Sequence, residues 1–255
     1  MTLRFDRLLF GSLILGLAAG AWAQVPLERP SATAWHPATD SWYVADLGSQ
    51  TEAGGWLARL DRRDKRAQPR WLAGFRAPRA LAAVGDLLYV ADSDEVVVVD
   101  APKAAIVARH RIKGARLLAG IAVSAEGEAY VSDMLSNAIH RVEKDGRSSR
   151  LRGCEGLEGP AGLFLDGEVL LVASRGPVSD AKTLATKGLG HLDAVNVGTG
   201  RVKRIGPSVR GRFESVLKIK GFYLASDSAE GTVTRVQADG GLEIIRRGLR
   251  DCGGL

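Results

Sequence analysis

A short strand pattern returns roughly every forty to fifty residues along this chain. Each copy is an apolar run that ends in small and acidic residues. The copies stand at residues 42–46, 88–92, 129–133, 170–174 and 222–227. Helical periodicity is nearly absent after the first twenty residues. A repeat of this size in such a chain predicts an all-β protein whose repeating units are the blades of a β-propeller.

The third copy shows how one blade is encoded. An apolar run at 120–123 is joined by a turn to an alternating strand at 128–132. A second alternating stretch at 138–143 leads through the turn residues 144–146 into the more polar stretch 147–152. Each copy therefore predicts four strands, with an apolar inner strand and a water-facing outer one. Blade faces need neighbouring blades to cover them, so the copies are expected to fold together.

An acidic residue recurs at the end of the second strand of several copies. Asp46, Asp92 and Asp133 occupy this position. A carboxylate between a strand and a loop accepts hydrogen bonds from nearby backbone N–H groups. We therefore predict that these residues hold turns together and take no part in catalysis.

The first 23 residues have the pattern of a secretory signal peptide. Two arginines precede an apolar stretch at 8–19, and Ala21-Trp22-Ala23 matches a small-x-small cleavage site. This stretch is too short to span a bilayer comfortably, and nothing later in the sequence resembles a membrane helix. We expect an exported protein, periplasmic or secreted, whose single propeller domain covers residues 24–255.

The net charge of +6 does not predict nucleic-acid binding. The densest basic run, at 62–66, lies between the third and fourth strands of the first copy and has no interleaved aromatic residues, so we expect a solvated hairpin. The four histidines have no zinc-site spacing, and we expect solvated or turn positions for His36, His110, His140 and His191.

The two cysteines, Cys154 and Cys252, are candidates for one disulfide in an oxidising compartment. Sequence spacing alone leaves open whether they come within bridging distance.

Several motifs together resemble the gluconolactonase and regucalcin (senescence marker protein) family of six-bladed propellers, in particular its exported bacterial members. They stand at residues 78–82, 88–92, 129–134 and 159–163. The resemblance implies a divalent metal ion, usually calcium, at the top of the central channel. Oxygen ligands from the inner strands would hold it, and it would serve lactone hydrolysis.

Most of the ligand positions that the resemblance implies are not filled by ligands here. Aligning the motifs places Ser31, Ala119 and Ala161 where the family has Glu, Asn-Asp and Asn ligands, with Glu28 as a displaced alternative to Ser31. Of the four positions, Glu214 alone keeps a carboxylate. One carboxylate is too few for a calcium ion, which takes six or more oxygen ligands.

Under this resemblance the sixth blade is incomplete. Residues 248–253 look like the entrance to a sixth inner strand, and the sequence stops at Leu255. Three explanations stay open, in this order: an interrupted six-bladed gene product, a ring of five blades, and a gap closed by another subunit.

The function expected from these observations is that of a lactonase-like propeller without its metal site, with no catalytic residue and no cofactor. It would bind a small molecule or a protein partner at the channel mouth near Ser31, Ala119, Ala161 and Glu214. One alternative is a calcium-dependent lactone or ester hydrolase with the ligands Glu28, Glu214 and Asp251. The other alternative is a protein-interaction scaffold, and the oligomeric state is left open.

Overall fold

The chain folds into five four-stranded antiparallel sheets and one small two-stranded hairpin. The structure is a computed structural model that describes residues 26–49, 54–209, 211–237 and 239–249. The predicted signal peptide, the tail from residue 250 and Cys252 lie outside these ranges. None of the described residues forms a helix, and therefore none forms a helix long and apolar enough to cross a membrane.

Each sheet is one copy of the sequence repeat. Blade 1 contains β1 (Pro30–His36), β2 (Ser41–Asp46), β3 (Gly55–Asp61) and β4 (Ala67–Phe75). Blade 2 contains β5 (Pro78–Val84), β6 (Leu87–Asp92), β7 (Glu95–Asp100) and β8 (Ala105–Arg111). Blade 3 contains β9 (Leu118–Val123), β10 (Ala129–Asp133), β11 (Ala138–Val142) and β12 (Ser148–Arg150).

The last two blades follow the same order, with one insertion. Blade 4 contains β13 (Pro160–Asp166), β14 (Val169–Ser174), β17 (Gly190–Asn196) and β18 (Val202–Val209). The insertion between β14 and β17 folds into the hairpin of β15 (Val178–Asp180) and β16 (Ala185–Thr186). Blade 5 contains β19 (Phe213–Ile219), β20 (Phe222–Asp227), β21 (Thr232–Gln237) and β22 (Leu242–Arg246).

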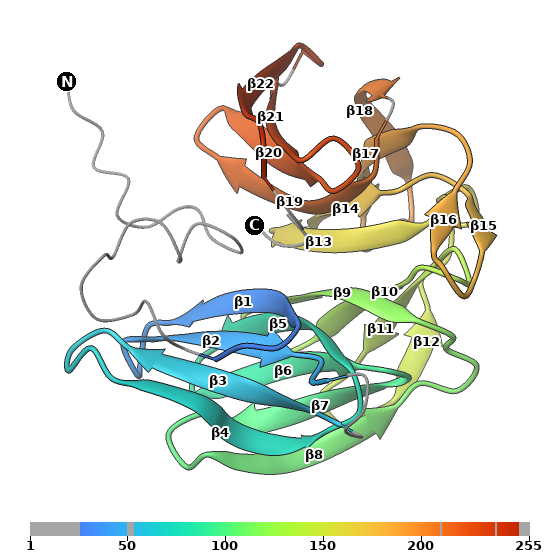
Figure 1. The fold of residues 1–255 in the computed structure, drawn as a ribbon. Helices are drawn as coiled ribbons and strands as arrows, with labels where there is room; N and C mark the ends of the chain where they lie inside the picture. Colours follow the sequence, from blue (N-terminus) through green and yellow to red (C-terminus); the bar gives the residue numbers. More distant parts are fainter. Residues whose placement is uncertain (1–25, 50–53, 210, 238, 250–255) are drawn as a thin grey trace.

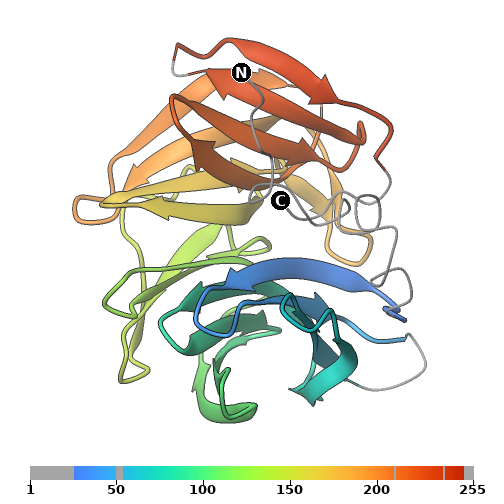
Figure 2. The same cartoon turned by 90° about the vertical axis from the view of Figure 1, so that its left-hand side faces the viewer.

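In the described part of the chain, the five blades are arranged in an arc of a propeller (Figure 1). The inner strand of each blade lies against that of the next, from β1 to β5, β9, β13 and β19. Within the described residues, no comparable contact joins β19 back to β1. Figures 1 and 2 place blade 1 and blade 5 at the two ends of this arc. The prediction of an all-β propeller is confirmed with five blades, and the strand expected at 248–253 falls mostly outside the described residues.

Apolar side chains fill the spaces between successive blades. The four consecutive valines of β7 show the pattern, because neighbouring side chains of a strand point to opposite faces of its sheet. Val97 and Val99 join the core shared with blade 1, whereas Val96 and Val98 join the core shared with blade 3. A strand that is buried on both faces reads as a continuous apolar run, as the sequence of β7 does.

The predicted hydrogen bonding of the recurrent aspartates to backbone N–H groups is confirmed. Asp46 accepts hydrogen bonds from the backbone N–H groups of Glu28 and Arg29, at 2.8 and 2.9 Å, just before the inner strand of its own blade. Asp92 and Asp133 make the same kind of contact. Each carboxylate therefore holds the end of the second strand to the segment that enters the inner strand, and we call this contact the aspartate latch.

Blade 5 has a fourth aspartate latch, which uses Asp227. Its carboxylate accepts from the backbone N–H groups of Arg212 and Ala229 at 3.0 and 2.9 Å. Asp227 ends β20 just as Asp133 ends β10. The latch is therefore a feature of four of the five blades.

The basic hairpin and three of the histidines can also be placed. Arg62 and Arg63 lie in the turn between β3 and β4 and both pair with Asp40. Their side chains are 65% and 73% exposed, so the hairpin is solvated as predicted. The expectation of solvated positions is wrong for His36, His140 and His191, which are buried. His36 does contact the turn after β1, because the backbone N–H of Thr39 donates to its Nδ1 at 3.1 Å. The ring of His140 faces the carboxylate of Asp133 with Nε2 3.6 Å from Oδ2, a distance too long for a hydrogen bond.

Candidate functional site

Every inner strand carries a β-bulge or register irregularity at its second residue. In β19, for example, Phe213 is paired with Asp227 and Ser215 with Ser226, so that Glu214 has no partner in β20. A bulge of this kind turns one side chain out of the regular alternation. The equivalent residues of the five blades are Ser31, Arg79, Ala119, Ala161 and Glu214. We call these five residues the bulge ring.

A cavity of about 350 Å³ lies along the inner strands and reaches the bulge ring. Ser31, Arg79, Ala119 and Glu214 all line it. Three of the four residues expected at the channel mouth therefore border one space. The fourth, Ala161, is 2% exposed and is represented in the cavity wall by its neighbour Gly162.

Backbone groups from adjacent blades approach each other closely beside Ala161. The Ala161 carbonyl accepts a hydrogen bond of 2.5 Å from the hydroxyl of Ser132 in blade 3. A Cβ atom added to Gly120 would stand 2.0 Å from the same carbonyl oxygen. Glycine at 120 therefore permits the close contact between blades 3 and 4 at the Ala161 carbonyl.

Glu214 takes part in a buried ion pair that crosses from blade 5 to blade 4. Its Oε1 lies 3.0 Å from Nε of Arg175, and the side chains are 14% and 9% exposed respectively. The hydroxyl of Ser228 donates to the same oxygen, and Nη1 of Arg175 lies 3.4 Å from Sδ of Met134. Burial raises the pKa of Glu214, and the charge of Arg175 opposes that rise. The pair holds a carboxylate at the bulge ring with its charge partly balanced.

Arg79 places a second guanidinium at the same end of the cavity. Its Nε is buried and has no hydrogen-bond partner among the described residues. Burial lowers the pKa of Arg79, and the positive charges of Arg29 and Arg175 lower it further. Arg212 acts on Arg175 in the same direction. Arg29, Arg79, Arg175 and Arg212 therefore act on one another in this region, where Glu214 and the latch carboxylate of Asp227 are the anions, so the cations outnumber the carboxylates.

The origin of Arg175 is a departure of blade 4 from the repeat. Where the other blades have a latch aspartate, β14 ends in Ser174, whose hydroxyl has no partner among the described residues. The backbone N–H of Gly159, which precedes β13, binds Oδ1 of Asn137 at 2.9 Å instead. With the latch replaced, the next residue, Arg175, directs its side chain to Glu214.

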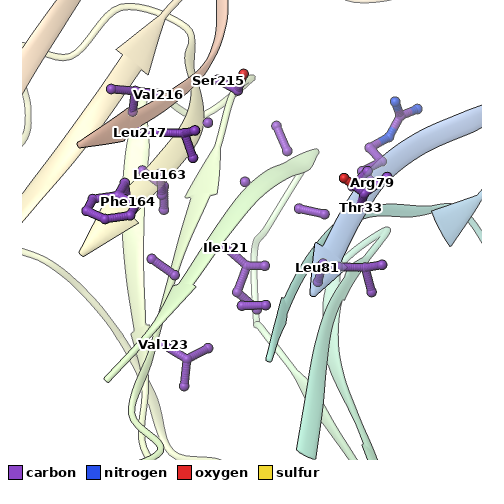
Figure 3. Close-up of a pocket in the computed structure, with 18 of the residues that line it drawn as sticks. Thr33, Arg79, Leu81, Ile121, Val123, Leu163, Phe164, Ser215, Val216 and Leu217 are labelled. Carbon is purple, nitrogen blue, oxygen red and sulfur yellow. The ribbon is translucent and has the colours of Figure 1, made fainter. Parts of the chain in front are cut away.

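The cavity wall carries little charge beyond the bulge ring. Figure 3 shows Arg79 and Ser215 toward one end of the cavity and Val123 toward the other. Among the described residues that line the cavity, Arg79 and Glu214 are the charged ones, and most of the rest are alanine, glycine or larger apolar residues. The inner strands pair on one side only, so their free edges also face the channel.

The bulge ring does not fit a divalent metal ion. Its single carboxylate is paired with Arg175, and Arg79 adds a cation to the ring. Glu28 pairs with Arg70 of β4 at 3.0 Å, and Asp251 lies outside the described residues. No group of three His, Cys, Asp or Glu residues with metal-binding geometry occurs in the described part of the chain. A hard cation that takes six or more oxygen ligands is poorly matched to this donor set.

Sequence reasoning missed the two arginines of this site, although each had a signal. Arg79 stands in the motif Pro-x-small that also contains Ser31 and Ala161, so aligning the inner strands would have placed it in the bulge ring. Arg175 directly follows the second strand of the fourth copy, and this strand lacks the terminal aspartate of the other copies. A break in a repeat at a strand end was therefore the available signal.

Cys154 lies in the core between blades 3 and 4, away from this site. It is 1% exposed, and burial raises the pKa of its thiol to about 11. Its predicted partner, Cys252, falls outside the described residues. The disulfide stays a prediction.

Comparison with known proteins supports the fold. No protein-family model and no curated protein matches the chain. Among solved structures, a chain from "Crystal structure of Nidogen/Laminin Complex" is similar, with a TM-score of 0.66 and 14% sequence identity. The match covers 88% of this chain and 83% of that chain. At this level of identity the likeness establishes the β-propeller fold alone.

Proposed function

We propose that this protein is an exported, gluconolactonase-like β-propeller that binds a small molecule at the bulge-ring end of its channel without a metal ion. The observation that supports the proposal is the shared cavity, in which an arginine and a glutamate from different blades lie beside small side chains. Concave sites with a few convergent polar groups are typical of small-molecule binding. The sequence resemblance supplies the link to the gluconolactonase-like propellers, and the pattern at residues 1–23 supplies the export.

The binding proposal can be tested by blocking the channel. Ala119 lines the cavity, so Ala119→Trp places an indole in the space that a ligand would occupy. The matched control is Val107→Trp on the outer strand β8, where Val107 is 54% exposed. A small-molecule library is screened by thermal shift against the original protein and both variants.

We expect some compounds to raise the melting temperature of the original protein and of Val107→Trp but not that of Ala119→Trp, because a ligand stabilises the folded state that it binds. A screen without any compound of this kind would overturn the proposal. If Ala119→Trp does not fold, Ala119→Leu fills less of the cavity and serves the same comparison.

The absence of a metal role has its own test. Calcium is titrated into the purified protein by calorimetry, with Glu214→Gln as the comparison. The arginine-paired carboxylate predicts no micromolar binding. Micromolar calcium binding that Glu214→Gln abolishes would favour the metal-dependent hydrolase instead.

A further inference from the structure

We infer that the ligand of the bulge-ring site is a small organic acid, with one carboxylate held at Arg79 and an uncharged body lying along the channel. This inference rests on the proposed function, because it assigns the chemical class of the molecule bound there. It is carried by the charge balance of the ring, the bonding state of each arginine, and the composition of the channel wall.

The first step is the surplus of positive charge. Glu214 is the carboxylate of the bulge ring, and it already has Arg175 at 3.0 Å and Ser228 as partners. Arg29, Arg79 and Arg212 are further cations at the same end, and the latch carboxylate of Asp227, which also acts on Glu214, is a second anion there. The cations still outnumber the carboxylates. Placing like charges together under partial burial is unfavourable unless an anion accompanies them. An anionic group from outside the chain would relieve this repulsion.

The second step separates the two arginines that reach the ring. Arg175 forms an ion pair with Glu214 and lies against Met134, although its buried Nε, like that of Arg79, has no hydrogen-bond partner of regular geometry among the described residues. Arg79 lines the cavity, is itself a member of the bulge ring, and leaves its buried Nε without a partner among the described residues. A guanidinium presents parallel N–H donors that match the two oxygens of a carboxylate. Arg79 is therefore the group that would hold the acid.

The third step concerns the body of the ligand. The cavity of about 350 Å³ is at the small end of the usual range for ligand sites, so the molecule is small. Beyond the ring, none of the described residues that line the cavity is charged. The hydroxyl of Ser31 in the ring and that of Ser215 next to it are both engaged within the fold, since Ser31 donates to the Pro78 carbonyl at 2.6 Å and Ser215 bonds to Ser226 at 2.6 Å. A second charge on the ligand would therefore be left without a partner.

The experiment compares acids with their own neutral and cationic counterparts. Benzoate, octanoate and gluconate are each tested with the matching primary amide, and benzylamine and octylamine are included as cations. Binding is measured by calorimetry and thermal shift on the original protein, on Ala119→Trp, and on Arg79→Gln. The matched control is Arg111→Gln, which removes an exposed guanidinium from the outer strand β8.

At least one acid is expected to bind at least about tenfold more tightly than its amide, and Arg79→Gln should weaken it by about tenfold or more, the loss typical of a charge-assisted hydrogen bond. Ala119→Trp should abolish binding, Arg111→Gln should leave it unchanged, and Arg79→Lys should retain part of it. Amides that bind as well as acids, or acid binding that is insensitive to Arg79→Gln, would overturn the inference.

The outcomes also separate this inference from the proposed function. One alternative outcome is that neutral or cationic compounds are the ones that bind the original protein and fail to bind Ala119→Trp. That result would uphold a binding site in the channel and refute the inference that its ligand is an acid. If Ala119→Trp abolishes the binding of no compound in this panel or in the library, the proposed function fails and this inference fails with it.

Discussion

Blade 4 and the other four blades solve the same structural problem in different ways. In blades 1, 2, 3 and 5 an aspartate at the end of the second strand holds the entrance of the inner strand. In blade 4 a serine stands there, an asparagine from blade 3 binds Gly159, and Arg175 reaches Glu214 at the channel. The comparison teaches that the repeat builds both the fold and the bulge ring, and that the ion pair between Arg175 and Glu214 arises where blade 4 departs from the repeat.

The largest effect is expected from breaking a latch. Asp133→Ala removes two backbone hydrogen bonds and the neighbour of His140, and should lower the free energy of unfolding by about 3 to 4 kcal/mol. Ser174→Ala in blade 4 removes a hydroxyl that has no partner among the described residues, and should change stability by less than about 0.5 kcal/mol. Denaturation in urea measures both. Equal losses in the two variants would remove the distinction between the blades.

A smaller loss is expected from breaking the ion pair of blades 4 and 5. Glu214→Leu or Arg175→Met leaves one charge unpaired, and with side chains 14% and 9% exposed in the pair the cost should be about 2 kcal/mol each. The double variant should lose less than about 1 kcal/mol, because it leaves no unpaired charge behind. Urea denaturation of all four proteins completes the cycle. Additive losses would mean that the pair is not coupled as its geometry requires.

The pH dependence should differ between two latches in equivalent positions. Burial would raise the pKa of Asp133, but the nearby polar groups of His140 and Ser136 and the backbone N–H groups of Arg116 and Leu117 outweigh it, so the pKa is lowered. Its stabilisation is therefore complete above the unfolded value of about 4 and is lost as pH falls below it. Burial raises the pKa of Asp92. Its contribution to stability therefore grows as pH falls.

This contrast is measured with Asp133→Asn and Asp92→Asn in urea between pH 7 and pH 3. The stability difference between the original protein and Asp133→Asn should shrink in acid. The difference for Asp92→Asn should grow. The same trend for both variants would contradict the assigned directions.

The smallest effect on stability is expected at the ring arginine. Arg79→Gln removes a partly buried cation that stands near Arg29 and Arg175. Its stability should change by no more than about 0.5 kcal/mol, or rise slightly. A loss of more than about 2 kcal/mol in urea denaturation would show that Arg79 serves the fold, in the way that Asp133 does.

The fold could be predicted because its signals are local and repeated. The valines of β7 alternate between two cores, and the aspartates mark the strand ends. The order of the four strands within a blade follows from these signals. The sequence left open whether the ring closes, because the spacing of β19 and β1 depends on how the five blades are arranged about one axis; within the described residues these two strands do not pack as successive inner strands do.

The site was predictable where it follows the repeat and not where it departs from it. Ser31, Ala119 and Glu214 are each the second residue of an inner strand. Aligning the motifs of the three blades therefore places them at equivalent positions. Arg175 comes from a loop after β14, and its partner is 39 residues further along the chain (214 − 175) in another blade. No local pattern encodes such a pair.

The most direct test of the electropositive ring measures its potential without a ligand. Ala119→Cys places a thiol at the ring, and Val107→Cys serves as the surface control, both with Cys252→Ser and with the buried Cys154 left in place. Each thiol is treated with an anionic sulfonate and a cationic trimethylammonium methanethiosulfonate reagent. The anionic-to-cationic rate ratio should be at least about tenfold higher at 119 than at 107, and Arg79→Gln should reduce it. A ratio at 119 equal to or below that at 107 would contradict the account.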